Sequence, residues 1–367
     1  MRPFAFAFVC VASSALACSS STSSPPPSDD AASDADAKSD SATDGDAGEV
    51  ADTTPTYPIP TPDDVQFVAK NPLPEGEQII FNDWNADPNR VKSMKPDGSE
   101  AIEIFSVYRV WSMGVSHSVD RLAFACGDRY QKEHYGIDVG DAIQHTWIYD
   151  VAKQTIEPIG VGNLNDECHR FSQDDKTLFV CRRYDFTPEA SFSGWRLGSF
   201  DLASKKFAFI RPEDPGVYMF GPQPTPDGKE VWWTEMTKAP PQTSRVLRAA
   251  LPGLDPVTVV RADKASRAVL SPDGKKYAYN DTGSKSAIHV VGADGSGDVK
   301  VATAPGTTVT WSPDGTRIAY LLFDSADSCS HIEVVKTDGS QADAPTRVRD
   351  CGVTREFPSA LAWVVKK

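Results

Sequence analysis

The sequence predicts an all-β protein, a six-bladed β-propeller with four antiparallel strands in each blade. A turn motif based on Ser-Pro-Asp-Gly recurs between runs of β-branched and aromatic residues. The copies are spaced on the order of the 40–50 residues that a four-stranded blade occupies. The chain also begins with strands that lack an innermost partner and ends in one strand without a hairpin. These three observations together predict a closed ring.

The clearest copy of the motif is Ser-Pro-Asp-Gly at 312–315. Pro313 presets φ near about −65° for the first turn position, and Gly315 supplies a positive φ at the exit. The flanking segments 309–311 and 318–320 are β-branched and aromatic, as half-buried strands require. We therefore predict a hairpin closed by a type I turn and a left-handed residue.

Five hairpins carry this unit, although the two N-terminal copies have neither Pro nor Gly and are degenerate. Each hairpin is followed by two further strand-like runs, as at 331–335 and 346–349 in the last copy. Four strands per unit are typical of a propeller blade. The five turns lie at 116–121, 172–176, 225–229, 271–275 and 312–315.

The two ends of the propeller explain each other. Segments 79–81, 91–94 and 101–105 supply the second, third and fourth strands of a first blade. The C-terminal segment 359–364 has the character of an innermost strand with no hairpin after it. We predict that it completes the first blade, which closes the ring, removes its exposed edges and gives six blades.

The Ser-Pro-Asp-Gly turns, the Asp-Gly-Ser turns at 294–296 and 338–340 and the six blades resemble the TolB-type, WD40-like propellers. The resemblance covers residues 76–367. It implies the fold and a habit of binding proteins in the bacterial envelope. We expect an acidic tether in the place of the additional N-terminal α/β domain of that family.

Residues 1–17 have the features of a signal peptide, with a short basic start and an apolar core too short to span a bilayer. They end in Ser-Ala-Leu-Ala-Cys at 14–18, which resembles the bacterial lipobox. We expect a lipid on Cys18; ordinary secretion with cleavage near Ala17 is the alternative. Ser19 resembles the outer-membrane sorting signal, so we expect an anchored protein that faces the periplasm or the cell surface.

The segment 18–75 predicts a disordered acidic tether between this anchor and the propeller at 76–367. Residues 18–52 carry nine acidic side chains against Lys38 alone. Such a composition buries too little apolar surface to offset the entropy of ordering. No later segment has the ~18 apolar residues of a spanning helix. We expect contact with the membrane only through the lipid.

The formal net charge of −14 argues against nucleic acid or an anionic membrane surface as a partner, because both require clustered Lys and Arg. The sequence contains no nucleophile elbow, Walker loop or dinucleotide fingerprint. We therefore expect a monomer without cofactor or enzymatic activity. His134 and His145, with Asp138 and Asp141, are more readily explained as polar loop residues than as metal ligands.

The loop after the second strand and the link to the next blade share one face of a propeller, and here that face carries the long insertions. The longest run over 127–145 and 182–194. Variable loops on a rigid scaffold commonly bind partners. The alternative is that these loops cap the channel without binding a partner. The candidate binding residues are Asp128, Arg129, Tyr130, Glu133, His134, Tyr135, Arg183, Tyr184 and Asp185.

An exported protein meets oxidising conditions, so disulfides are expected. Cys329 and Cys351 flank the last two strands of the sixth blade and form the best pair. Cys168 and Cys181 lie symmetrically about a hairpin turn and would face each other. Cys126 is then left over, or takes Cys168 as its partner instead.

The leading hypothesis is an envelope lipoprotein whose propeller binds another envelope protein. One alternative is a propeller that binds a small ligand, glycan or metal at the channel mouth, with or without enzymatic activity. The other is a structural spacer with no specific ligand. Convergent carboxylates at the channel mouth would favour the first alternative.

Overall fold

The computed structural model describes thirteen segments of the chain. Residues 55–367 form one compact unit. Among the described residues no helix is long and apolar enough to cross a membrane. Residues 1–58 lie outside this set, and with them the predicted signal peptide, Cys18 and most of the tether. The described segments are 59–83, 86–127, 144–160, 164–184, 195–211, 216–239, 243–254, 257–261, 265–281, 287–303, 306–324, 329–350 and 360–367.

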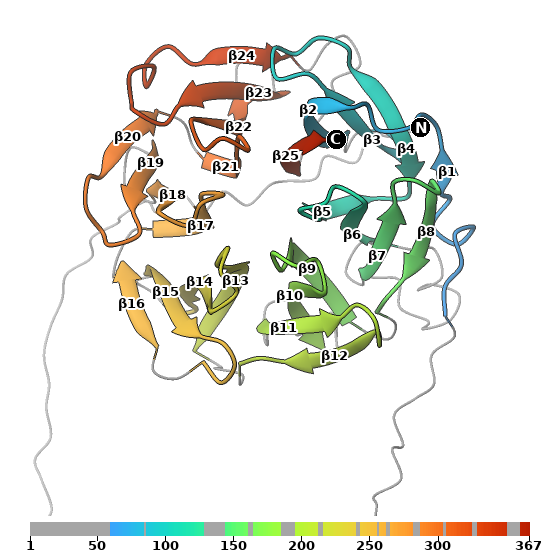
Figure 1. Ribbon diagram of the computed structural model, residues 1–367, viewed down its shortest axis with the longest axis horizontal. Helices are drawn as coiled ribbons and strands as arrows, with labels where there is room; N and C mark the ends of the chain where they lie inside the picture. The colour runs from blue at the N-terminus through green and yellow to red at the C-terminus, as the bar shows by residue number, and fades with distance from the viewer. Residues whose placement is uncertain are drawn as a thin grey trace, which may run out of the picture. The chain divides into compact units, whose positions relative to one another are not determined.

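The compact unit is a six-bladed β-propeller, as the sequence predicts (Figure 1). Within each blade the strands are antiparallel and follow one another from the centre outward. Blade 2 contains β5 (Val110–Val115), β6 (Arg121–Cys126), β7 (His145–Asp150) and β8 (Thr155–Pro158). Blade 3 contains β9 (Leu164–Phe171), β10 (Thr177–Tyr184), β11 (Arg196–Asp201) and β12 (Lys206–Phe209).

Blades 4 to 6 repeat the same order. Blade 4 contains β13 (Val217–Pro224), β14 (Glu230–Thr237), β15 (Ser244–Ala250) and β16 (Thr258–Arg261). Blade 5 contains β17 (Ala265–Leu270), β18 (Lys276–Asp281), β19 (Ala287–Gly292) and β20 (Val299–Ala302). Blade 6 contains β21 (Gly306–Trp311), β22 (Arg317–Asp324), β23 (Cys329–Lys336) and β24 (Thr346–Arg349).

Blade 1 joins the two ends of the propeller, which confirms the predicted closure. The C-terminal strand β25 pairs with β2, with Trp363 opposite Ile79. Figure 1 shows β25 as the innermost strand of this blade. The sheet order is β1-β4-β3-β2-β25. Its strands are β1 (Val68–Ala69), β2 (Gly76–Asp83), β3 (Asn89–Met94), β4 (Ile102–Val107) and β25 (Leu361–Lys366).

The propeller unit begins earlier than the predicted boundary at residue 76. Strand β1, a fifth outer strand of blade 1, pairs with β4 through Val68 and Ser106. Val65 and Leu73 are buried in the cluster that joins blades 1 and 2. The expectation of a disordered tether up to residue 75 is therefore wrong for residues 65–75, because Val65 and Leu73 are buried in the core and β1 pairs with β4.

The recurring turn has the predicted hydrogen bonds. In the last copy the Gly315 N–H donates to the Ser312 carbonyl at 2.9 Å, and Gly315 has a φ of 70°. The Ser312 hydroxyl donates to the Asp314 carboxylate at 2.6 Å and accepts from the Arg317 N–H at 2.9 Å. These local bonds explain why Ser and Asp accompany the Pro-Gly pair. In the degenerate turns Val119 and Asp175 take the left-handed position, with φ of 58° and 56°.

The cores lie between neighbouring blades. Phe105 of blade 1 stacks against Tyr149 of blade 2 with ring centroids 4.6 Å apart. The indole N–H of Trp311 in blade 6 donates to the Val269 carbonyl of blade 5 at 3.0 Å. The innermost strands β5, β9, β13, β17 and β21 each carry a register shift against the second strand. Such bulges bend a strand and redirect its side chains.

Candidate recognition face over blades 2 and 3

The hairpin turns of neighbouring blades lie against one another on one edge of the propeller. A Cβ added at Gly274 in blade 5 would lie only 2.8 Å from Cδ of Pro226 in the blade 4 turn. The connections β6–β7 and β10–β11 leave their sheets at the other end of the second strand, after Cys126 and Tyr184. Both long connections therefore start on the edge opposite the turns, as the sequence analysis expects.

The structure describes only part of the predicted binding residues. The positions from Asp128 to Tyr135, and Asp185, lie outside the described residues. Arg183 and Tyr184 are the last two residues of β10, where they pair with Asn165 and Leu164 of β9. The sequence-based insertion 127–145 is too long at its C-terminal end, because His145 is the buried first residue of β7.

A buried ion pair lies directly below the start of the β10–β11 connection. Arg182 of β10 donates from Nε and one terminal nitrogen to the two carboxylate oxygens of Asp166 in β9, both at 2.6 Å. The side chains are 3% and 0% exposed. The Phe207 ring lies 3.7 Å from the guanidinium carbon. Gly160 permits this packing, since an added Cβ would lie 2.8 Å from the guanidinium nitrogen.

The ion pair continues into a hydrogen-bonded chain that crosses from blade 3 to blade 2. The Thr146 hydroxyl of β7 donates to the Asp166 carboxylate at 2.8 Å and lies 3.0 Å from Nε2 of His169. Because the single hydroxyl proton goes to the carboxylate, Nε2 of His169 must donate to Thr146. Nδ1 then accepts from the Ser112 hydroxyl of β5 at 2.6 Å. This network assigns a neutral His169.

Burial explains why His169 stays neutral. Desolvation by burial, opposed by Asp166 and assisted by the nearby Arg170 and Arg182 cations, lowers the pKa of His169 to about 4. A neutral imidazole keeps one donor and one acceptor nitrogen, which the two hydroxyls require. The network is thus a fixed set of hydrogen bonds at neutral pH.

The network fixes one end of each of the two long connections. The Asp166 N–H donates to the Gln144 carbonyl at 3.0 Å, and Gln144 forms a bridge with Asn165 at the end of the β6–β7 connection. Arg182 immediately precedes Arg183 and Tyr184 in β10. The sequence analysis did not identify Asp166, Arg182 or His169. Arg182 directly follows the apolar run 178–181 of β10, and a charge at such a position normally requires a buried partner. Asp166 and His169 lie in the mostly polar strand β9 and carried no such signal.

The cysteines differ from the prediction. Cys126, Cys168 and Cys181 are free thiols, so neither a Cys168–Cys181 nor a Cys126–Cys168 bond is formed. Cys181 pairs in register with Glu167, and the bulge at Cys168, with a φ of 63°, offsets the two sulfurs. They are hydrogen-bonded instead, and this contact together with burial holds the pKa of the Cys181 thiol far above its usual range.

Cys181 and Cys329 have separate structural roles. The Gly221 N–H at the bulge of β13 donates to the Cys181 sulfur at 3.2 Å, which links blade 3 to blade 4. Cys329 in β23 is disulfide-bonded. Cys351 lies outside the described residues, so its pairing with Cys329 stays a prediction.

One carboxylate in each of blades 4 to 6 is satisfied by hydrogen bonds within the protein. In each blade an aromatic donor and an arginine hold one carboxylate, which is the arrangement of an internal brace rather than of a ligand site. Among the described residues no group of three His, Cys, Asp or Glu side chains is arranged to hold a metal ion. The donor–acceptor pairs are Trp233–Glu235 with Arg245, Tyr279–Asp298 with Arg261, and Tyr320–Glu333 with Arg347.

The comparisons with known proteins concern the fold. No protein-family model matches the sequence, and no curated protein matches it. The structure of TolB from Acinetobacter baumannii is similar, with a TM-score of 0.61 and 16% identity over 80% of this chain and 67% of that chain. A putative TolB from Agrobacterium tumefaciens gives 0.53 and 12%, over 76% of this chain and 90% of that one. This chain therefore shares the β-propeller fold of the TolB structures.

Proposed function

We propose that this protein is an envelope lipoprotein whose β-propeller binds another protein through the edge that carries the β6–β7 and β10–β11 connections. The observation that supports this best is the common root of these connections. The β6–β7 connection ends, and the β10–β11 connection begins, at one buried network of Arg182, Asp166 and Thr146, with bonds of 2.6 and 2.8 Å. Long segments on such a base lose less freedom on binding than segments on a mobile one.

The residue types in these connections suit protein recognition. Tyr and Arg are enriched at the centres of protein interfaces, and the segments 128–143 and 185–194 supply both the acidic and the aromatic side chains of such a surface. The likeness to the TolB structures supports the scaffold. The choice of an envelope protein as the partner comes from the resemblance stated above and from the predicted anchor.

The anchor is the second part of the proposal. A lipid on Cys18 and the acidic segment that follows would keep the propeller at the membrane without a spanning helix. Labelling with a clickable palmitate analogue tests this part directly. The wild-type chain should incorporate the label and fractionate with the outer membrane, whereas Cys18→Ser should lose both properties. Labelling of the variant to the same level would contradict the assignment.

Crosslinking in cells, followed by purification and mass spectrometry, tests recognition. The full-length protein should capture one abundant partner. A variant in which residues 128–143 are replaced by a short Gly-Ser linker should lose it, because Gln144 and His145 stay in place and preserve β7. The matched control is Lys176→Ser with Lys229→Ser, two exposed changes on the turn edge, which should retain the partner.

The remaining outcomes separate the alternatives. Equal capture by the linker variant would contradict recognition by this edge. Absence of any partner, together with a small molecule or metal retained in the native mass, would favour a ligand site at the channel mouth. Absence of both would favour a structural spacer.

A further inference from the structure

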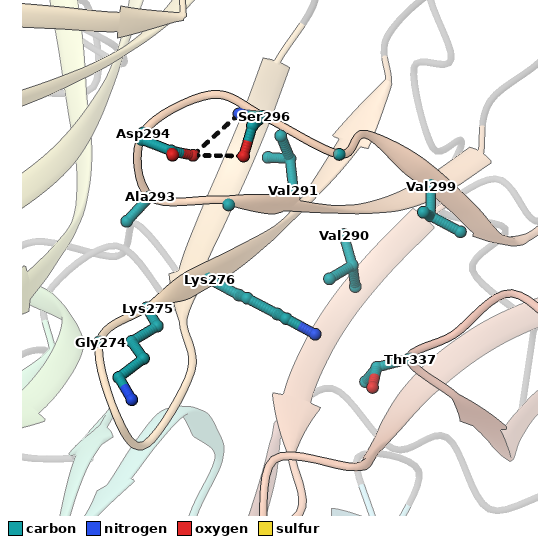
Figure 2. A pocket seen from close by; sticks show the side chains of 12 residues that line it. Gly274, Lys275, Lys276, Val290, Val291, Ala293, Asp294, Ser296, Val299 and Thr337 are labelled. Carbon is teal, nitrogen blue, oxygen red and sulfur yellow. Dashed lines mark hydrogen bonds between the residues drawn. The ribbon is translucent and has the colours of Figure 1, made fainter.

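A groove on the turn edge, between blades 5 and 6, is separate from the proposed recognition edge. Its volume is about 570 Å³, within the range of ligand-binding clefts. It is bounded by the β17–β18 turn, the β19–β20 turn and the turn after β23 (Figure 2). Its floor is apolar, since Val290 of β19 and Val299 of β20 are directly paired there.

The wall from blade 5 is rigid. The Gly292 N–H donates to the Ser296 carbonyl at 2.8 Å, which closes the β19–β20 turn. The Ala293 N–H donates to the Lys275 carbonyl at 2.8 Å and ties this turn to the β17–β18 turn. Asp294 accepts from the Ser296 N–H and hydroxyl at 3.0 and 2.6 Å (Figure 2), and these bonds lower the pKa of its carboxyl group. This acid is therefore already committed within the turn.

The wall from blade 6 is fixed in the same way. The Thr337 N–H and hydroxyl both donate to the Thr316 carbonyl, at 3.0 and 3.1 Å. The turn that follows packs directly on blade 5, because a Cβ added at Gly339 would lie 2.7 Å from Cγ1 of Val299. The two walls are thus held at a set separation, and the groove exists before any ligand arrives.

The side chain of Lys276 lies over the apolar floor of this groove, which Lys275 and Asp294 also line. Figure 2 shows its side chain extending over the groove toward Val290 and Thr337, whereas the side chain of Lys275, which also lines the groove, extends in another direction. Within the described part of the chain Lys276 forms no ion pair. The backbone N–H of Lys275 donates to the Asp273 carboxylate at 3.0 Å, and the Ser271 hydroxyl together with Lys275 lowers the pKa of that carboxyl group. Lys300, in the neighbouring strand β20, forms an ion pair with Asp343 at 3.5 Å. Lys276 is therefore a cation without a counter-charge in a protein of net charge −14.

We infer that this groove binds a short acidic segment of a partner protein, in which a Glu or Asp lies next to an aliphatic residue. The carboxylate would pair with Lys276, and the aliphatic side chain would cover Val290 and Val299. A cation above an apolar floor recognises these two groups together, and neither a neutral peptide nor a basic one offers both. This surface is independent of the recognition edge over blades 2 and 3.

Fluorescence anisotropy with the purified full-length protein tests the inference. The probes are a fluorescein-labelled Glu-Leu-Glu-Leu peptide and its Lys-Leu-Lys-Leu and Gln-Leu-Gln-Leu counterparts. The acidic peptide should bind, and Lys276→Gln should weaken it at least fivefold. The matched control Lys275→Gln, the adjacent exposed lysine, should change the affinity less than twofold. The variant with residues 128–143 replaced should bind normally, which separates this inference from the proposed function.

Two further measurements can overturn the inference. Val299→Asp places on the floor a negative charge that repels the acidic peptide. This variant should not bind the peptide, while circular dichroism shows an intact fold. Equal losses in Lys275→Gln and Lys276→Gln would indicate unspecific attraction by surface charge. Binding to phosphatidylglycerol vesicles that depends on Lys276, with none to the acidic peptide, would assign the groove to a lipid headgroup and contradict a protein partner.

Discussion

Asp175 of blade 3 caps the turn of blade 2 by accepting hydrogen bonds from the backbone N–H groups of His117 at 2.7 Å and Ser118 at 2.8 Å. Asp175 occupies the position that glycine holds in the regular turns, with a φ of 56°. His117 and Ser118 occupy the positions of Pro and Asp. In the regular turns the proline of one blade packs on the glycine of the next. In the two turns that lack the motif, the Asp175 carboxylate makes the contact between the blades instead.

Replacing Asp175 tests this compensation. Asp175→Gly relieves a left-handed backbone at a gain on the order of 1 kcal/mol, but it removes two bonds to a charged acceptor worth about 1.5–3 kcal/mol each. We expect a net loss of about 2–5 kcal/mol in the free energy of unfolding, and a larger loss for Asp175→Ala, which keeps the backbone strain. Urea denaturation measures both. An Asp175→Gly variant as stable as wild type would show that turn geometry outweighs the bridge.

The buried pair of Arg182 and Asp166 should be sensitive to loss of either partner. Asp166→Asn leaves a guanidinium with 3% exposure without its counter-charge, and we expect a loss of about 3–5 kcal/mol. The double variant Asp166→Leu with Arg182→Met removes both charges and should lose less stability than Asp166→Leu alone or Arg182→Met alone. A double-mutant cycle from denaturation curves measures the coupling. Additive losses would contradict a mutually dependent pair.

His169 should make stability depend on pH in a defined window. Its folded pKa of about 4 lies below the ordinary value of 6.5, so the unfolded chain binds more protons between these values. The free energy of unfolding therefore falls as pH drops from 6.5 to 4, by about 3 kcal/mol in total. His169→Gln cannot titrate and should flatten this slope. Parallel slopes for the variant and the wild type, from thermal or urea unfolding at several pH values, would assign the dependence to other groups.

The closing strand β25 should be essential to the folded ring. Removal of residues 361–367 exposes the inner edge of β2. We expect the truncated protein to aggregate and to lose cooperative unfolding. Trp363 is 6% exposed, and Trp363→Ala should cost about 3–5 kcal/mol. The control Val365→Ala changes a side chain that is 42% exposed on the same strand, and should be nearly neutral. A monomeric, cooperatively folded truncation would show that the other five blades suffice.

Local chemistry made much of the fold predictable. The Ser312 to Gly315 turn forms through bonds between residues at most five positions apart, so its residues alone specify it. The closure by β25 was also predictable, because the first blade lacks its innermost strand and the last strand has no hairpin partner, so pairing the two completes both. The start of the propeller was misplaced, since Val65 and Leu73 are isolated apolar residues that only the finished core can accept.

By itself the sequence determined the blades, their turns, the closing strand and the edge that carries the long connections, because each depends on local patterns of strand and turn. The tertiary structure alone decided the network of Ser112, Thr146, Asp166, His169 and Arg182, the bridge from Asp175 to His117, and the position of Lys276 in its groove. Their partners come from different blades or distant strands, and no periodicity in the chain relates one to another. Packing of neighbouring blades brings these groups together, and burial then requires that each member of the network around Asp166 and Arg182 has a partner.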